Sequence, residues 1–220
     1  MSFRKPSNRG GGKKFIGKFP SFRMDAIVWF ESLLERDYLY LLEFDLAVLA
    51  FYAQACRFYY RLGGKKRIYT ADFYVVRQDS KQVVEVKPEA KAREPEKREI
   101  FCIAAEACER QGLEFRVVTD AEIRSEPRLD NVKLLIKYQR TPIDPQHRIL
   151  CHEFFARRPE ASLAQVAEFF ASKGVGRQTL YSLMRWGAIG FDLTAPIDDD
   201  SPLFYPGRNA AEREVRRAEV

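Results

Sequence analysis

The feature that most constrains the fold is a pair of apolar runs separated by a short polar turn. The first run covers residues 67–76 and the second covers residues 81–86, with Gln78, Asp79 and Ser80 between them. Both runs are rich in valine and aromatic or β-branched residues, which favour strands over helices. Two such runs with a short polar turn between them predict an antiparallel hairpin.

Three charged side chains interrupt these runs. Asp72 lies in the first, and Glu85 and Lys87 follow thirteen and fifteen positions later. Because side chains alternate along a strand, Glu85 and Lys87 project from one face, and Asp72 reaches that face if the runs pair. Carboxylate oxygens are ligands that Mg²⁺ prefers, and a lysine offsets charge on a phosphate. The pattern indicates metal-dependent phosphodiester hydrolysis. The alternative is a hairpin whose charged pair faces solvent.

The remaining segments complete one α/β domain over residues 25–140. Apolar spacing predicts a helix over residues 25–42, a strand with breaks over 46–60, a helix over 92–111 ended by Gly112, and a strand over 113–119. The order helix, three strands, helix, strand is that of the restriction-endonuclease-like (PD-(D/E)xK) core. In that core the first helix often supplies another acid, and Glu35 and Glu31 are the candidates. The alternative is that both are exposed helix carboxylates.

The N-terminal residues 1–24 form a basic arm. The chain has a net charge of +6, and no acid precedes Asp25. A basic arm of this kind commonly follows a phosphate backbone, although it can also serve as a solubilising terminus. The cations expected to contact DNA are Arg4, Lys5, Arg9, Lys13, Lys14 and Lys18.

Residues 141–205 are predicted to form a small helical, winged-helix-like domain. Prolines at 142 and 145 mark its start, and helices are expected over 147–156, 162–172 and 177–185, with a possible wing from residue 186. The turn at 173–176 suits a helix-turn-helix, which places Arg177 and Gln178 at the start of a recognition helix. Three-helix modules also bind proteins, so both kinds of partner stay open. Residues 206–220 are a charged tail.

Several function classes have no support in the sequence. The four cysteines form no C-x-x-C pair, and the two histidines, His147 and His152, lie far along the chain from Asp72 and Glu85, so a zinc site or a Ser-His-Asp mechanism is not indicated. No nucleotide-binding glycine motif occurs. The apolar stretch over 38–55 contains acids and is too short to cross a bilayer, and the N-terminus lacks the apolar core of a signal peptide. We expect a cytoplasmic protein without membrane partners.

Four short motifs, taken in order, resemble the TnsA family. These are Ser32–Asp37, Leu41–Asp45, Thr70–Phe73 and Val84–Pro88. TnsA is the endonuclease subunit of the heteromeric transposase of Tn-seven-like transposons, including those linked to CRISPR systems. The resemblance covers residues 15–125 well and the C-terminal helical module loosely.

The resemblance implies a bacterial endonuclease that cuts the 5′ strands at transposon ends and acts on DNA in the nucleoid. A TnsB-like recombinase would process the 3′ strands, and a TnsC-like AAA+ ATPase would contact the C-terminal part. Glu35 and Asp72 would be metal ligands, Lys87 would be the catalytic lysine, and Glu85 would be a third ligand where the best-known member has glutamine. The implied cofactor is Mg²⁺, with Mn²⁺ as a substitute.

Two other functions use the same residues differently. A stand-alone restriction or repair nuclease would cut DNA without a second protein. A non-catalytic DNA-binding scaffold would tolerate replacement of Asp72 and Lys87 but not of the basic arm or Arg177.

Overall fold

The computed structural model describes residues 16–206, and its internal contacts divide the chain into two units. The first ends at Ser125 and the second begins at Glu126. The sequence analysis placed this boundary after residue 140. In the structure, helix α5 (Arg128–Ile136) belongs to the second unit and not to the first. No helix within residues 16–206 has the length and apolar character needed to cross a membrane.

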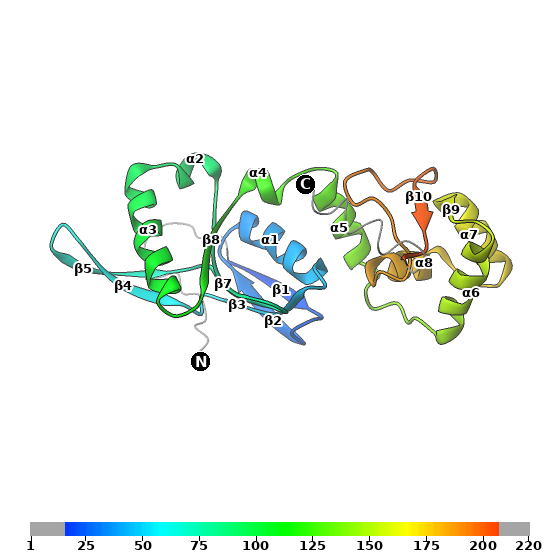
Figure 1. The fold of residues 1–220 in the computed structure, drawn as a ribbon, viewed down its shortest axis with the longest axis horizontal. Helices are drawn as coiled ribbons and strands as arrows, with labels where there is room; N and C mark the ends of the chain where they lie inside the picture. The colour runs from blue at the N-terminus through cyan, green and yellow to red at the C-terminus, as the bar shows by residue number, and fades with distance from the viewer. Residues whose placement is uncertain (1–15, 207–220) are drawn as a thin grey trace. The chain divides into compact units, whose positions relative to one another are not determined.

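The N-terminal unit is built around a four-stranded mixed sheet. Its elements are β1 (Gly17–Ser21), β2 (Ala26–Phe30), α1 (Leu33–Phe44), β3 (Val48–Ala53), β4 (Arg57–Leu62), β5 (Lys65–Thr70), β6 (Phe73–Arg77), β7 (Lys81–Lys87), α2 (Glu89–Ala92), α3 (Pro95–Glu109), β8 (Glu114–Thr119) and α4 (Asp120–Ile123). The sheet order is β3-β6-β7-β8 (Figure 1). The β3-β6 and β6-β7 pairs are antiparallel and β7-β8 is parallel, which fits a restriction-endonuclease-like core.

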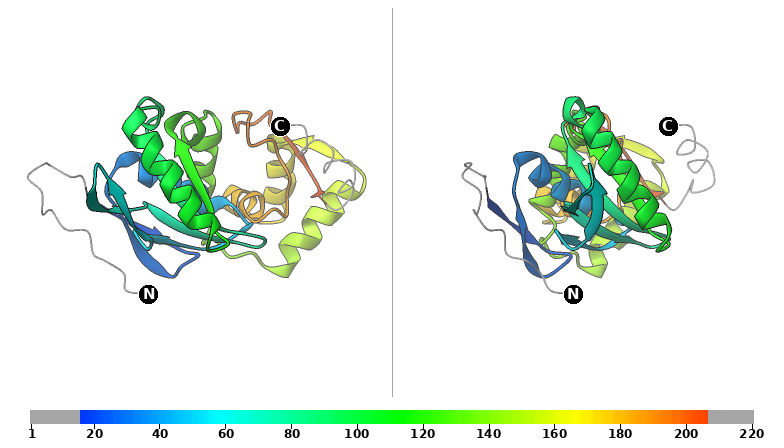
Figure 2. Two further views of the ribbon diagram at one scale, coloured as in Figure 1. Left: turned by 60° about the vertical axis from the view of Figure 1, so that its left-hand side comes forward. Right: turned by 90° about the vertical axis from the view of Figure 1, so that its left-hand side faces the viewer.

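The two faces of this sheet are covered by different elements. Val84 and Val86 pack with α1 and with the β1-β2 hairpin in one hydrophobic core. Val83, which points the other way, packs with Cys108 of α3. Figure 2 shows α1 and α3 on opposite sides of the strands. Because side chains alternate along β7, Glu85 belongs to the same face as Val83, the face that α3 covers.

The predicted helix over residues 25–42 is wrong in its first part. Ala26–Phe30 is strand β2, which pairs with β1, and Val28 and Phe30 alternate into the core. The helix begins only after Ser32, whose side chain accepts a hydrogen bond from the backbone N–H of Glu35 at 3.1 Å. This N-cap satisfies a backbone donor at the helix start and fixes where the helix begins.

The predicted run over residues 67–76 is two strands. β5 pairs with β4, whereas β6 pairs with β3 and β7, and the chain changes partner at Ala71 and Asp72. At this crossing Ala71 N–H donates to Cys56 O at 3.1 Å, and Gln54 N–H donates to Asp72 O at 2.8 Å. The hairpin of β6 with β7 is confirmed, and so are the helix before Gly112, which has a φ of +66°, and the strand after it.

The C-terminal unit is mostly helical. Its elements are α5, α6 (Pro145–Ala156), β9 (Glu160–Ser162), α7 (Leu163–Ser172), α8 (Arg177–Arg185) and β10 (Pro202–Phe204). Ser162 caps α7 and shares a reciprocal capping box with Gln165. The segment expected to start a wing has no strand within residues 186–192, and only Gly190 bridges to Phe204. The winged-helix assignment stays a prediction.

Glu43 is a buried carboxylate that joins the end of α1 to the β1-β2 turn. It is 1% exposed and accepts hydrogen bonds from the Ser21 hydroxyl at 2.7 Å and from Phe22 N–H and Arg23 N–H at 2.9 and 3.0 Å. The Arg23 guanidinium in turn donates to Glu43 O and Asp45 O at 3.1 and 2.9 Å. These contacts hold the β1-β2 hairpin against α1.

We expect Glu43→Ala to lower the free energy of unfolding by about 3 kcal/mol, because three donors, including the buried Ser21 hydroxyl, lose their acceptor. Glu43→Gln keeps one carbonyl oxygen for the two backbone donors and should cost about 1 kcal/mol. Urea unfolding followed by circular dichroism measures both. The exposed Glu109→Ala is the control and should change stability by less than about 0.5 kcal/mol. Equal changes in the free energy of unfolding for Glu43→Ala and the control would show that Glu43 does not have this structural role.

Candidate active site

The adjoining ends of β6 and β7 bring together Asp72, Glu85 and Lys87. The register places Phe73 opposite Val84, so Asp72 lies next to Glu85 and Val86. The Val86 N–H donates to Asp72 Oδ2 at 2.8 Å. Lys87 Nζ lies 2.7 Å from Glu85 Oε1 and 4.0 Å from Asp72 Oδ2. The hairpin thus delivers three of the four residues singled out in the sequence to one place.

These charged groups do not lie on an open, solvated face. The side chain of Glu85 is 3% exposed, that of Asp72 is 16% exposed and that of Lys87 is 30% exposed. Burying carboxylates is costly unless they are paired or hydrogen-bonded. The ion pair with Lys87 and the hydrogen bond from the Val86 N–H partly offset that cost.

Tyr69, which the sequence analysis did not select, is part of this cluster. Its hydroxyl donates a short hydrogen bond to Glu85 Oε2. Its ring lies 6.5 Å from both Phe101 of α3 and Phe115 of β8, measured between ring centroids. Burial and, next, the Glu85 carboxylate raise the pKa of Tyr69, so the hydroxyl keeps its proton and remains a donor. The only sequence signal was its position three residues before Asp72.

Glu35 lies in the first turn of α1 and is held by local backbone contacts. Its Oε2 accepts from the Glu31 N–H at 2.7 Å, while its own N–H donates to Ser32. Glu31 precedes the helix, so the two glutamates do not share a helical face. Burial raises the pKa of Glu35, and the Lys87 cation acts against that shift. Glu35 therefore interacts electrostatically with the cluster at the sheet end.

Burial and the neighbouring charges shift the pKa values of Asp72 and Lys87. Burial, followed by the negative charge of Glu85, raises the pKa of Asp72 well above its ordinary value, and Lys87 only partly opposes this. Burial by itself lowers the pKa of Lys87, but Asp72 and Glu85 together bring it above its ordinary value. Lys87 is therefore a stable cation, and negative charge on Asp72 is disfavoured in the cluster as it stands.

The donor chemistry of the cluster fits a hard divalent cation. Asp72 and Glu85 offer carboxylate oxygens, and the raised pKa of Asp72 reports negative charge that a cation would relieve. Within residues 16–206, however, no three His, Cys, Asp or Glu side chains are already grouped closely enough to hold a metal. Asp72 and Glu85 are the residues best placed as ligands, and Glu35 stays the predicted third.

The residues predicted to contact DNA lie in different parts of the chain. Arg4, Lys5, Arg9, Lys13 and Lys14 fall outside the described residues. Lys18, on β1, places its ammonium 4.9 Å from the ring centroid of Trp29. Arg177 forms an ion pair with Asp199, and Gln178 beside it is exposed. Much of α8 beyond these two residues is buried, which leaves its N-terminal end as the accessible part.

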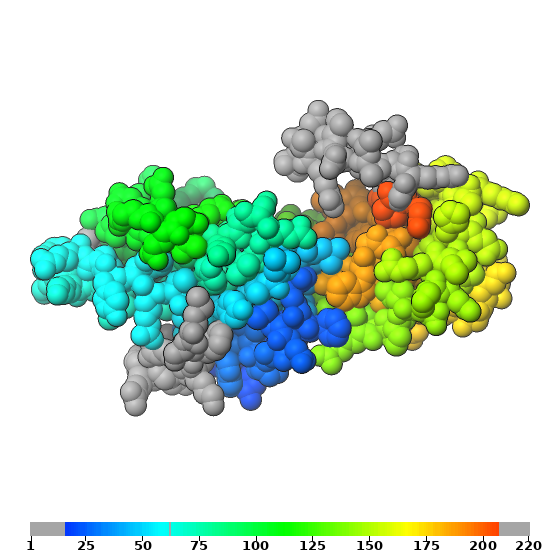
Figure 3. Space-filling view, turned by 60° about the horizontal axis from the view of Figure 1, so that its bottom comes forward, coloured from blue at the N-terminus to red at the C-terminus, as the bar shows by residue number. Residues whose placement is uncertain are grey.

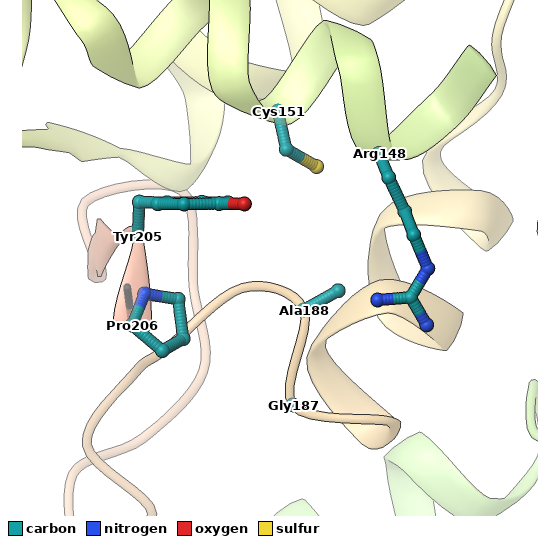
Figure 4. Close-up of a pocket in the computed structure, with 6 residues that line it drawn as sticks. All are labelled: Arg148, Cys151, Gly187, Ala188, Tyr205 and Pro206. Atoms are coloured by element: carbon teal, nitrogen blue, oxygen red, sulfur yellow. The ribbon is translucent and has the colours of Figure 1, made fainter. Parts of the chain in front are cut away.

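A small pocket in the C-terminal unit contains none of the predicted site residues. It encloses about 190 Å³ and is lined by Arg148, Cys151, Gly187, Ala188, Tyr205 and Pro206. Figure 4 shows the Cys151 side chain pointing from α6 toward this space. Burial raises the pKa of Cys151 to about 12, so its thiol is a poor nucleophile at neutral pH.

Comparison with known families agrees with the geometry of the N-terminal unit. Residues 45–120, about a third of the chain, match the family described as TnsA-like endonuclease N terminal. No curated protein matches the chain. The matched segment contains Tyr69, Asp72, Glu85 and Lys87, whereas Glu35 precedes it. The resemblance drawn from the sequence motifs is confirmed over this segment, and it implies nuclease activity.

The raised pKa of Asp72 has a consequence for stability. Because the folded protein holds the Asp72 proton more tightly than the unfolded chain, this group stabilises the fold below its unfolded pKa, and the contribution is lost as pH rises through the folded pKa. Asp72→Asn should therefore raise the free energy of unfolding at about pH 8 by on the order of 1 kcal/mol. At about pH 4 the difference should largely disappear.

Urea unfolding in the presence of EDTA at both pH values measures this difference. Asp79→Asn, an exposed acid in the β6-β7 turn, is the matched control and should show no such pH dependence. A variant Asp72→Asn that is less stable than wild type at the higher pH would contradict the expected sign.

Proposed function

Since the chain carries a TnsA-like endonuclease domain over residues 45–120, we propose that it is the Mg²⁺-dependent endonuclease subunit of a transposase that cuts the 5′ strands at transposon ends. The observation that carries the proposal is the cluster of Asp72, Glu85 and Lys87, which lies inside the matched segment at the end of the β6-β7 hairpin. Two buried carboxylates around a lysine suit phosphodiester hydrolysis better than they suit a purely structural role.

Asp72, Glu85 and Glu35 would hold the Mg²⁺. When bound, the ion polarises the phosphoryl oxygens and lowers the pKa of a coordinated water. Lys87, 2.7 Å from Glu85, is placed to balance the negative charge that develops on the phosphate. Tyr69 holds Glu85 in one orientation through its hydroxyl. Asp72 must lose its proton before it can act as a ligand, and this becomes easier as pH rises.

The partners follow from the same family relation. The substrate would be double-stranded DNA at the transposon ends, where a TnsB-like recombinase cuts and joins the 3′ strands. Cutting of both strands gives excision in place of a copied cointegrate. The C-terminal unit, proposed to be winged-helix-like, would contact a TnsC-like ATPase, DNA or both. Its exposed Gln178 at the start of α8 is one candidate contact.

We expect Asp72→Ala to lose 5′-strand cleavage by a factor of at least about 10², because it removes a ligand from the site. The measurement is strand-specific end cleavage in Mg²⁺ with the cognate recombinase present. Cutting and joining of the 3′ strands should persist in the variant, and Asp79→Ala should cleave like wild type. If Asp72→Ala still cuts the 5′ strands, the acidic cluster is not catalytic and the scaffold alternative gains support.

Metal binding can be tested without any cleavage. Mg²⁺ should raise the thermal midpoint of the wild-type protein, because a ligand that binds only the folded state stabilises it. At a concentration about 100 times the dissociation constant the gain is about 2.7 kcal/mol. Asp72→Ala should lose this response, and Asp79→Ala should keep it. An equal Mg²⁺ response in Asp72→Ala would place the cation elsewhere.

The stand-alone nuclease alternative is separated by omitting the recombinase. A partner-dependent subunit cuts poorly by itself, whereas a restriction or repair nuclease cuts efficiently on its own. Efficient cleavage of arbitrary duplex by the purified chain would therefore favour that alternative while leaving Asp72 as its ligand.

A further inference from the structure

The hairpin formed by β4 and β5, here called the β4-β5 ribbon (residues 57–70), is separate from the central sheet. Its six residue pairs run in continuous register from Arg57 with Thr70 to Leu62 with Lys65. Gly63 and Gly64 close it with φ angles of +56° and +76°, the positive values that a two-residue type I′ turn requires. Figure 1 shows the ribbon extending past α3. A two-stranded hairpin is marginally stable alone, so its base must be anchored.

The anchor is the cross-strand pair of Phe58 and Tyr69. Their ring centroids lie 6.0 Å apart, and Phe58 packs with Ala71, Val83 and Cys108 in the core under α3. This pair defines which face of the ribbon points inward. Because alternate residues along a strand point to opposite faces, the next pair along the ribbon points outward.

That outward pair is Tyr59 and Ile68. The two residues lie directly opposite each other, and they are 78% and 60% exposed. Residues opposite each other in an antiparallel pair have neighbouring side chains on one face. Two large apolar side chains thus form a small exposed patch on the ribbon. Figure 3 shows the ribbon in cyan at the left edge of the N-terminal unit, with much of its surface uncovered in that view.

The ribbon is also strongly basic. Residues 57–70 contain five cations and no acid: Arg57, Arg61, Lys65, Lys66 and Arg67. Arg61 and Lys66 are directly opposite each other, two positions along from Tyr59 and Ile68, so they share the outward face. All five cations are exposed, and none forms an ion pair with an acid among residues 16–206.

We propose that the β4-β5 ribbon is a DNA-binding element that lies in the major groove of the duplex beside the phosphate to be cut. This assignment rests on the proposed function for the location of that phosphate. The major groove, about 12 Å wide, admits a two-stranded ribbon. Arg61 and Lys66 would pair with backbone phosphates, and the Tyr59–Ile68 patch would contact the apolar edges of bases such as the thymine methyl group.

The location of the ribbon and its charge both favour DNA over a protein partner. The ribbon base reaches the acidic cluster directly, because the Tyr69 hydroxyl donates to Glu85 and the chain arrives at Asp72 two residues after Thr70. A duplex whose phosphate sits at Asp72 therefore has its neighbouring turns close to the ribbon. Five clustered cations without an acid among them are the mark of a phosphate contact.

The test compares the full-length wild type with Arg61→Gln/Lys66→Gln. Binding to a fluorescein-labelled duplex is followed by anisotropy in EDTA at several KCl concentrations, so no cleavage takes place. Each lost phosphate contact reduces the slope of log K against log salt by about 0.9, so the variant should lose a slope of about 2. At physiological salt its affinity should fall on the order of tenfold or more. Unchanged thermal midpoints show that the fold is kept.

The matched control is Lys81→Gln/Arg110→Gln, which removes one exposed lysine and one exposed arginine elsewhere in the same unit. It should bind with the wild-type salt slope. A second variant, Tyr59→Ser/Ile68→Ser, removes only the apolar patch. It should weaken binding by about fivefold and leave the salt slope unchanged, since no cation is lost.

Dimethyl sulfate footprinting of the bound duplex tests the groove, because guanine N7 lies in the major groove. Wild type should protect these positions, and the Arg61→Gln/Lys66→Gln variant at the same protein concentration should protect them much less. Wild-type binding and salt slope for Arg61→Gln/Lys66→Gln would overturn the ribbon proposal even if Asp72 proves catalytic. Conversely, loss of binding in this variant with no cleavage by wild type would uphold the ribbon and refute the nuclease assignment.

Discussion

The N-terminal unit depends on the compensation of two buried carboxylates at the end of an apolar sheet. Asp72 and Glu85 would each destabilise the fold if left without partners, and their partners come from two strands, β7 and β5. The Val86 N–H belongs to β7, Lys87 ends that strand, and Tyr69 comes from β5. The rings of Phe101 and Phe115 hold Tyr69 in place from α3 and β8. Helix α3 and strand β8 thus stabilise the position of the acidic cluster in addition to packing with the sheet.

Compensation of Asp72 is incomplete, and this separates the cluster from a structural ion pair. Glu43 is also buried, and its hydrogen bonds from Ser21, Phe22 and Arg23 join α1 to the β1-β2 turn. Asp72 has a raised pKa in spite of Lys87, so its negative charge remains unfavourable. A charged residue that does not stabilise the fold but is kept in it is expected at a site that binds or acts on a ligand.

The sequence pattern predicted the features of the fold that depend on residues close together in the chain. The β6-β7 hairpin, the positions of Asp72, Glu85 and Lys87, and the helix before Gly112 all follow from residue spacing within short segments. The β1-β2 hairpin could not be read in this way, because Ile27, Phe30 and Leu34 also fit helical spacing and only pairing with β1 decides between the two. Glu35 and Glu31 were candidates by analogy with the fold, and the family resemblance selected Glu35. Tyr69 could not have been found, since its role needs β5, α3 and β8 in place.

Tyr69 has a mechanical consequence. Tyr69 belongs to the inward-facing pair that anchors the ribbon, and its hydroxyl also donates a hydrogen bond to Glu85. A force applied at the tip of the β4-β5 ribbon therefore acts through a single aromatic ring on the orientation of a carboxylate in the cluster. If the ribbon binds DNA as proposed, bending of the bound duplex would change the position of Tyr69 and with it the orientation of the Glu85 carboxylate.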